Sequence, residues 1–347
     1  MPPTPTTAEP RPRMVAPVLP PFVERPGDRD RARHIATEAV ARGLDDVYFV
    51  GCGGSLASSY PVCCLLEDRA TGFAVHHLTS SEFVLRRLRR LGPRSLVAVA
   101  THTGTTPETL AAVDRARATG VPAIVGYTRD ADSPLGRAVD EVFEYGPAKT
   151  AWDAKHVQLA HLGHALLDVT GAGLGRAEVE AAYDAVPEVL PGAIDEAEPL
   201  CAEIARELRD APIVYVLGAG PLEATAYALS MCYLQEMQWM HSAAYNAGEF
   251  LHGAFEVATA DVPYIVFVGE DETRPMAERA LAFLRRYVRH VYVIDARDLS
   301  LPGIPAAMHA EIGVLALGAV STRLAQHFEA ARDHDLSTRR YMFTVEY

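Results

Sequence analysis

A single carboxylate inside an apolar stretch is the first candidate for chemistry. Within residues 221–240, Leu229, Tyr233, Glu236 and Met240 recur at spacings of four, three and four, which predicts an α-helix with these side chains on one face. Glu236 is the only charge on that face, so burial should raise its pKa toward neutrality unless a partner offsets it. Such a carboxyl can accept and return a proton near pH 7. A buried glutamate held by backbone or tyrosine hydroxyls is the structural alternative.

The second candidate is a histidine sixteen residues further along the chain. His252 follows Glu249 in a short segment bracketed by Gly248 and Gly253. A glycine-flanked turn leaves an imidazole more accessible than a long apolar helix does, and imidazole is the side chain best suited to proton exchange at neutral pH. A structural histidine is the competing interpretation at this position.

A loop rich in hydroxyl groups follows the apolar segment 96–100. Residues 101–108 read THTGTTPE, with four threonines, a flexible glycine, and a proline suited to a first helical turn. Hydroxyls and backbone N–H groups at a helix start can bind phosphate. The residues predicted to do so are Thr101, His102, Thr103 and Thr106. The alternative is ordinary helix capping by Thr105 or Thr106, with Glu108 closing a capping box.

The elements that must position these residues form a duplicated pattern. Apolar strand segments recur at an offset of 167 or 168 residues: 47–53 with 214–220, 96–100 with 265–268, and 123–126 with 291–294. Helical stretches separate the strands, which predicts parallel sheets wrapped by helices on both faces. Ligands in such sheets bind at the carboxyl ends of the strands.

The two copies differ in their loops, and this predicts a division of labour. In the second copy, residues 269–273 read GEDET, and the three carboxylates would repel phosphate. The turn 51–55 of the first copy resembles a dinucleotide fingerprint, but Leu56 replaces its third glycine and the next strand ends in His77 rather than an acid. We therefore reject a dinucleotide and assign Ser55 as a second phosphate or sugar donor.

We predict five parts along the chain: a flexible arm (1–29), a phosphate-binding α/β unit (30–150), a helical connector (151–192), a catalytic α/β unit (193–332) and a tail that closes the site (333–347). Each unit is a doubly wound, flavodoxin-like parallel sheet flanked by helices. Residues 1–27 lack a continuous apolar run, so they predict neither a signal peptide nor a membrane span.

Composition narrows the possible partners. The 347 residues carry 45 acids against 32 bases, a net charge of −13, which argues against a nucleic acid or a membrane surface as partner. A local site can still bind an anionic small molecule. The five cysteines are odd in number and form no CxxC, which indicates reduced thiols in a cytoplasmic protein rather than a metal or disulfide framework. No metal or other cofactor is required by the chemistry inferred above.

The chain resembles the double sugar-isomerase (SIS) family. This family includes the isomerase half of glucosamine-6-phosphate synthase and, more similar to this chain, fructoselysine 6-phosphate deglycase and related Amadori-product deglycases. The resemblance covers nearly the whole chain beyond the arm. Its motifs are Gly51-Cys52-Gly53-Gly54-Ser55, Ser81-Glu82-Phe83, the loop 101–106, Asp132-Ser133-Pro134, Gly248-Glu249-Phe250-Leu251-His252-Gly253 and the tail Arg339-Arg340-Tyr341 with Val345-Glu346-Tyr347.

The resemblance implies roles for particular residues. Glu236 would move a proton between C1 and C2 of a sugar, while His252, donated by the partner subunit of a homodimer, would open the sugar ring. Tyr341 stands where the synthase has a lysine. The substrate-binding and phosphate-binding residues implied by the resemblance and by the loops are Gly53, Gly54, Ser55, Thr101, His102, Thr103, Thr106, Trp152, Glu249, Arg340 and Tyr341.

The expected function is removal of an amine from a 6-phosphofructosyl amine or amino acid, which gives a hexose 6-phosphate. Two alternatives remain open. One is an aldose–ketose phosphosugar isomerase or an aminosugar-forming enzyme, and the other is a non-catalytic sugar-phosphate sensor. Retention of both Glu236 and His252 argues against the sensor.

Overall fold

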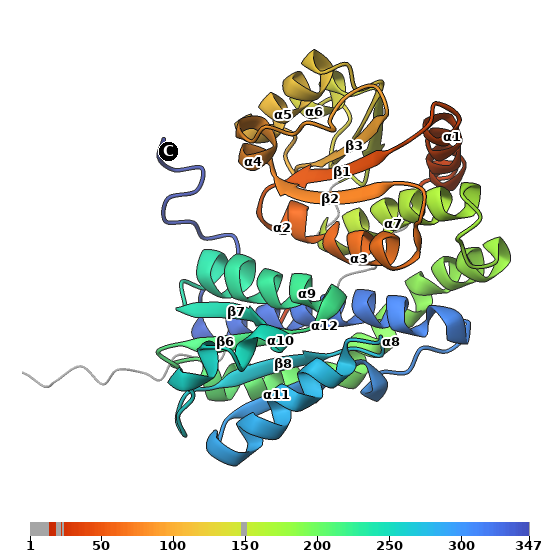
Figure 1. Ribbon diagram of the computed structural model, residues 1–347. Helices are drawn as coiled ribbons and strands as arrows, with labels where there is room; N and C mark the ends of the chain where they lie inside the picture. Colours follow the sequence, from red (N-terminus) through yellow and green to blue (C-terminus); the bar gives the residue numbers. More distant parts are fainter. Residues whose placement is uncertain (1–13, 19–21, 23, 147–150, 347) are drawn as a thin grey trace, which may run out of the picture.

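The structure is a computed structural model. It contains two parallel sheets, and Figure 1 shows the first sheet above the second. The structure describes residues 14–18, 22, 24–146 and 151–346. Much of the predicted arm, at 1–13, 19–21 and 23, therefore lies outside the described residues. Among the helices of the described residues, none combines the length and apolar character that crossing a membrane requires.

The first sheet has the strand order β2-β1-β3-β4-β5. All of its pairings are parallel, as expected for a flavodoxin-like unit. Its strands are β1 (Asp46–Gly51), β2 (Ala74–Thr79), β3 (Ser95–Ala100), β4 (Ala123–Thr128) and β5 (Glu141–Glu144). Its helices are α1 (Asp28–Ala41), α2 (Gly53–Ala57), α3 (Tyr60–Arg69), α4 (Ser80–Leu85), α5 (Pro107–Ala118) and α6 (Pro134–Ala138).

The second sheet follows the same order as the first four strands of the first sheet, β7-β6-β8-β9, and is also fully parallel. Its strands are β6 (Val214–Gly218), β7 (Ser242–Asn246), β8 (Tyr264–Val268) and β9 (Val291–Asp295). Its helical elements are η1 (Gly220–Leu222), α9 (Glu223–Tyr227), η2 (Ala228–Met237), α10 (Ala247–Phe250), η3 (Ala254–Val257), α11 (Arg274–Tyr287), η4 (Ala296–Asp298), η5 (Ala306–Met308) and α12 (His309–Arg332). The predicted α/β class with two parallel sheets is confirmed.

Apolar residues cover both faces of each sheet. Successive side chains of a strand point to opposite faces, so neighbouring residues belong to different apolar clusters. Val47 and Phe49 of β1 belong to one apolar cluster, whereas Tyr48 and Val50 belong to another on the opposite face. The second sheet repeats this arrangement through β8. Such double coverage explains why the central strands read as continuous apolar runs in the sequence.

Two long helices connect the units, α7 (Ala151–Val169) and α8 (Arg176–Leu208). The connector predicted over 151–192 corresponds to α7 and the first half of α8, and α8 continues unbroken through the predicted boundary. Figure 1 shows α7 on the side of the first sheet that faces the second. Helix α12 packs along α8 and lies beside the second sheet.

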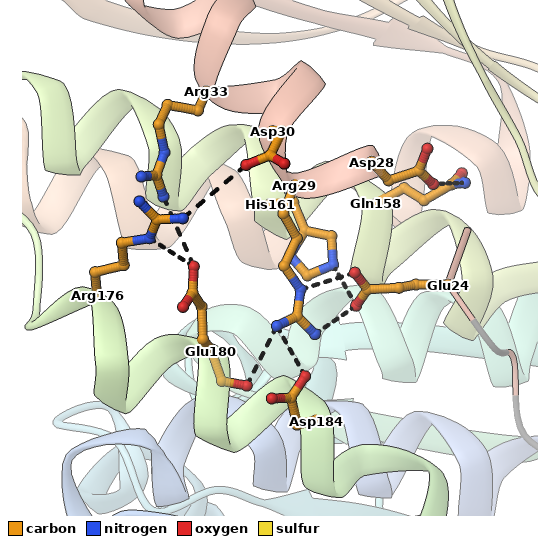
Figure 2. A network of polar contacts seen from close by, with 10 residues as sticks. All are labelled: Glu24, Asp28, Arg29, Asp30, Arg33, Gln158, His161, Arg176, Glu180 and Asp184. Carbon is orange, nitrogen blue, oxygen red and sulfur yellow. Dashed lines mark hydrogen bonds and ion pairs between the residues drawn. The ribbon is translucent and has the colours of Figure 1, made fainter. Parts of the chain in front are cut away.

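Two polar side chains of α7, His161 and Gln158, are hydrogen-bonded to residues at or just before the start of α1 (Figure 2). His161 bonds the carboxylate of Glu24 at 2.9 Å, and Arg29 donates two hydrogen bonds to the same carboxylate. Gln158 donates to Asp28 at 3.1 Å. Buried polar groups of this kind are stabilised only when they are paired. These contacts fix α7 against α1 and the segment before it, so the position of its first turns is fixed as well.

Candidate functional site

Glu236 lies in a π-helix and not in the α-helix predicted over 221–240. The segment begins with η1, continues as α9 and then winds as the π-helix η2, which ends at Met237. The i→i+5 bonding of a π-helix takes up more residues per turn than an α-helix does. The prediction that Leu229, Tyr233, Glu236 and Met240 share one face is therefore wrong, and Met240 lies beyond the helix. π-helical turns occur frequently at functional sites.

An arginine of the C-terminal tail holds the Glu236 carboxylate. The Arg339 guanidinium lies 2.9 Å from Glu236 Oε1, and the glutamate side chain is 24% exposed. Burial raises the pKa of Glu236 above its ordinary value, whereas the charge and hydrogen bond of Arg339 act to lower it. The direction agrees with the shift expected from the sequence, and it moves this carboxyl toward the range in which a base can also return its proton.

Replacing Arg339 with methionine should move the acid side of the pH–activity profile to higher pH. Glu236 acts as a base only when it is deprotonated, and loss of the guanidinium removes both influences that lower its pKa. The protonated, inactive form therefore persists to higher pH. The measurement is kcat/KM against pH. Arg340→Met is the matched control, because Arg340 lies over the Trp239 ring at 4.3 Å; an equal shift in both variants would contradict the assignment.

The hydroxyl loop is arranged by hydrogen bonds within the loop. Thr106 is the N-cap residue of α5, but its side chain makes no capping hydrogen bond. Its Oγ1 instead lies 2.7 Å from Oγ1 of the buried Thr101, and the hydroxyls of Thr103 and Thr105 are also 2.7 Å apart. The capping alternative is therefore wrong for Thr106. Four hydroxyls gathered at one strand end are available to an anion.

Gly104 is required by the shape of this loop. Its φ of +71° lies in the left-handed region, and a Cβ at this position would overlap the Ser133 side chain. Ser133 caps α6 by accepting from Gly136 N–H, so it cannot move freely. The loop is thus packed directly against the start of α6.

His102 is tied to a tyrosine and is uncharged at neutral pH. Its Nδ1 lies 3.0 Å from the Tyr145 hydroxyl, and the two rings are stacked. Burial lowers the pKa of His102 to about 4, and the nearby charges of Lys155 and Arg129 add to this shift. As a neutral imidazole, His102 can offer hydrogen bonding but no positive charge to a phosphate.

A lysine joins the glycine turn to the helix of Glu236. Lys155 Nζ donates to Ser55 Oγ at 2.7 Å, and both residues are buried. Cys232, in η2, packs its sulfur against Gly54 and is influenced by the charges of Glu236 and Lys155. Burial raises the pKa of this thiol to about 12, so it is neutral. Cys232 therefore lies next to the turn of Gly54 and Ser55, and both Lys155 and Glu236 are near enough to act on its thiol.

The corresponding loop of the second sheet is closed on itself. Asp271 accepts from both the backbone and the hydroxyl of Thr273. Arg274 donates to Gly269 O at 2.8 Å and forms a two-pronged ion pair with Asp295. The Thr273 hydroxyl and the Arg274 guanidinium are thus already engaged, and residues 269–273 lack the four clustered threonine hydroxyls of the first copy.

Other residues predicted for the site lie at several places. Trp152 is buried, stacks on His156 at 5.2 Å between centroids, and fills space left by Gly318 of α12. Gly53, with φ +55°, forms the turn beside Ser55. The remaining residues are exposed: Glu249, His252, Arg340 and Tyr341. No hydrogen bond or ion pair among the described residues joins His252 to Glu236.

Comparison with known proteins agrees with this architecture. No family model matches the chain. It is 33% identical over 306 residues to the fructosamine deglycase FrlB of Bacillus subtilis, covering 88% of this chain and 93% of that protein. The chain belongs to the fructosamine deglycase family of SIS proteins. The present chain is also 28% identical to the fructoselysine 6-phosphate deglycase of Escherichia coli, with 88% of each chain covered. A solved Bacillus subtilis protein described as a phosphosugar isomerase superposes with a TM-score of 0.86 at 30% identity, over 93% of this chain and all of the other.

Two site residues of this SIS protein are missing from the set expected from the sequence. The sequence indicates Arg339 only as part of the motif Arg339-Arg340-Tyr341, and it gives Lys155 no role. A weak signal exists for Lys155, because it is one of two lysines in the chain and stands within an apolar helix. The pairing of Arg339 with Glu236 has no local signal, since it depends on how the tail folds back.

Proposed function

We propose that this protein is a deglycase that acts on a 6-phosphofructosyl amine or amino acid. The observation that carries the proposal is the Glu236 carboxyl, whose pKa is raised by burial. It lies in η2, and Cys232 of the same helix packs its sulfur against Gly54, next to Ser55 in the first unit. The names of the family relatives support the same activity. Glu236 is the base, and the loop with Ser55 binds the phosphate.

The reaction needs one base that serves two adjacent carbons. In the open-chain substrate, C1 carries the amine and C2 is the carbonyl carbon. Glu236 removes a proton from C1, the electrons of the broken C–H bond form the C1–C2 double bond, and the C2 carbonyl oxygen takes a proton from solvent to give an enaminol. The protonated Glu236 then returns its proton to C2, and the nitrogen of the resulting iminium gives up its proton to solvent, which leaves an imine at C1. A carboxyl with a raised pKa suits both directions of transfer.

Water completes the reaction. It adds to the C1 imine, and the C1–N bond breaks to release the amine and an aldose 6-phosphate. Atoms balance with water as the only co-reactant, so oxidation and reduction play no part. The neutral thiol of Cys232 and the neutral imidazole of His102 provide a polar surrounding without competing nucleophilic thiolate.

Ring opening requires a second proton-transfer group, and His252 of a partner subunit is proposed for this role. His252 is exposed and lies in a turn that follows α10, and no hydrogen bond or ion pair in the described part of the chain joins it to Glu236. An isologous dimer can bring the exposed turn of each copy to the other copy's site. The complete site is then shared by two chains.

The direct test is a panel of 6-phosphofructosyl amino acids, assayed for hexose 6-phosphate and for free amine. We expect both products in equal amounts from at least one member. A second candidate, an aldose–ketose phosphosugar isomerase, is favoured by the description of a solved relative. The same panel with fructose 6-phosphate added separates the two, because an isomerase converts the simple sugar phosphate and releases no amine.

A further inference from the structure

Lys155 is a buried cation at the centre of the candidate site. Its side chain extends from the first turns of α7 and is only 4% exposed. Its Nζ donates to Ser55 Oγ at 2.7 Å. An ammonium group has three N–H donors, so one contact leaves two donors for another acceptor.

Within the described residues, Lys155 has no ion-pair partner. The neighbouring thiol of Cys232 is neutral, and burial alone lowers the pKa of Lys155, to about 8. An ammonium group without a counter-ion is costly to bury. The Lys155 ammonium group is therefore available to form an ion pair with an anionic ligand.

The lysine faces the same sheet edge as the hydroxyl loop. Ser55 follows β1 and Thr101 follows β3, and these strands are neighbours with Gly51 paired to Ala100. Ser55 and the loop 101–106 therefore emerge side by side. The charge of Lys155 also acts on His102 inside that loop. Arg129, the other cation that acts on His102, is exposed to solvent.

We infer that Lys155 supplies the positive charge that binds the phosphate group of the substrate, with Ser55 and the loop 101–106 as neutral donors. This inference rests on the proposed function, which calls for a phosphorylated sugar. A phosphate monoester carries between one and two negative charges at neutral pH and three acceptor oxygens. The phosphate supplies the counter-ion that Lys155 lacks. The Ser55 hydroxyl orients the Lys155 ammonium group before the substrate binds.

The test is a double-mutant-type cycle, in which the charge of Lys155 and the phosphate of the substrate are removed separately and together. Lys155→Met keeps the length of the side chain and removes its charge, and each protein is assayed with a fructosyl amine that does or does not carry the 6-phosphate. In the wild type, removing the phosphate should raise KM by roughly 10- to 100-fold, as expected for a charge-assisted contact. In Lys155→Met the phosphate should improve KM by less than about threefold. An equal benefit from phosphate in both proteins would overturn the inference.

Arg129→Met is the matched control, because it removes a cation near the same loop. Its charge is exposed and screened, so the benefit from phosphate should stay within about twofold of the wild type. Thermal unfolding checks the fold of each variant. Because Lys155 has no counter-ion in the described chain, its replacement by methionine should leave the melting temperature unchanged or raise it. If this variant does not fold, Lys155→Gln takes its place in the same cycle.

A separate arm distinguishes failure of this inference from failure of the proposed function. Inorganic phosphate binds without any turnover and should raise the melting temperature of the wild type by mass action. The shift should disappear in Lys155→Met and persist in Arg129→Met. A wild type that releases no amine from any substrate but shows this pattern refutes the deglycase assignment alone. A phosphate shift that survives in Lys155→Met refutes the role of Lys155 alone.

Discussion

Replacing Glu236 with glutamine should lower kcat by about 10²- to 10⁴-fold, the range typical of a lost general base. The substitution keeps the size of the side chain and its ability to accept from Arg339, which lies 2.9 Å from Oε1. It removes the only group proposed to take a proton from C1. Substrate binding is proposed to depend on the loop 101–106 and Ser55, so KM should change far less than kcat.

Exchange of hydrogen at C1 isolates the step in which Glu236 acts. In deuterated water the wild type should incorporate solvent deuterium into the sugar, whereas Glu236→Gln should not. Glu223→Gln is a useful control, since Glu223 is a carboxylate of the same segment that accepts from Asn246 at 2.8 Å and has no assigned part in proton transfer. Near-full turnover by Glu236→Gln would refute the mechanism.

Mixing two inactive variants should restore activity if the site is shared between chains. Glu236→Gln removes the base and His252→Ala removes the proposed ring-opening group, so each homodimer has two defective sites. In a mixed dimer, one site carries both defects and the other carries neither. With random exchange of subunits, about one quarter of all sites are then intact. We therefore expect roughly a quarter of the wild-type activity from an equal mixture.

The complementation result depends on which chain donates His252. If His252 served the Glu236 of its own chain, every site in a mixture would lack one group and activity would stay at the level of the parents. Sedimentation of the wild type tests the required dimer independently. A monomer with full activity would contradict the donation, whatever the mixture shows.

The central strands were predictable from the sequence, and so were two of the four edge strands, β2 and β9. Strands buried on both faces read as apolar runs, and all of those were recognised. The two missed strands, β5 and β7, lie at sheet edges. Their sequences, EVFE and SAAYN, carry charges or small residues because an edge strand is only partly covered.

The candidate site was partly predictable for a related reason. Hydroxyl residues that follow a strand and a carboxylate in an apolar stretch are local patterns, so Thr101, Thr106 and Glu236 could be singled out. The ion pair between Glu236 and Arg339 joins segments about a hundred residues apart, and the contact of Ser55 with Lys155 is equally remote. Only the packing of α7 and the tail creates these pairs. The π-helical winding of η2 likewise has no recognisable sequence signature.

The winding of η2 has a consequence for how this fold can evolve. Because each of its turns takes up more residues than an α-helical turn, the direction in which Glu236 points depends on the register of Ala228–Met237 as much as on its own identity. Loss of one residue from this stretch would rotate every later side chain by roughly a quarter turn about the helix axis. The carboxylate would still be present, but it would no longer lie where Arg339 holds it. A protein that evolves from this one could thus still bind a sugar phosphate but lose catalysis, although Glu236 itself is not replaced.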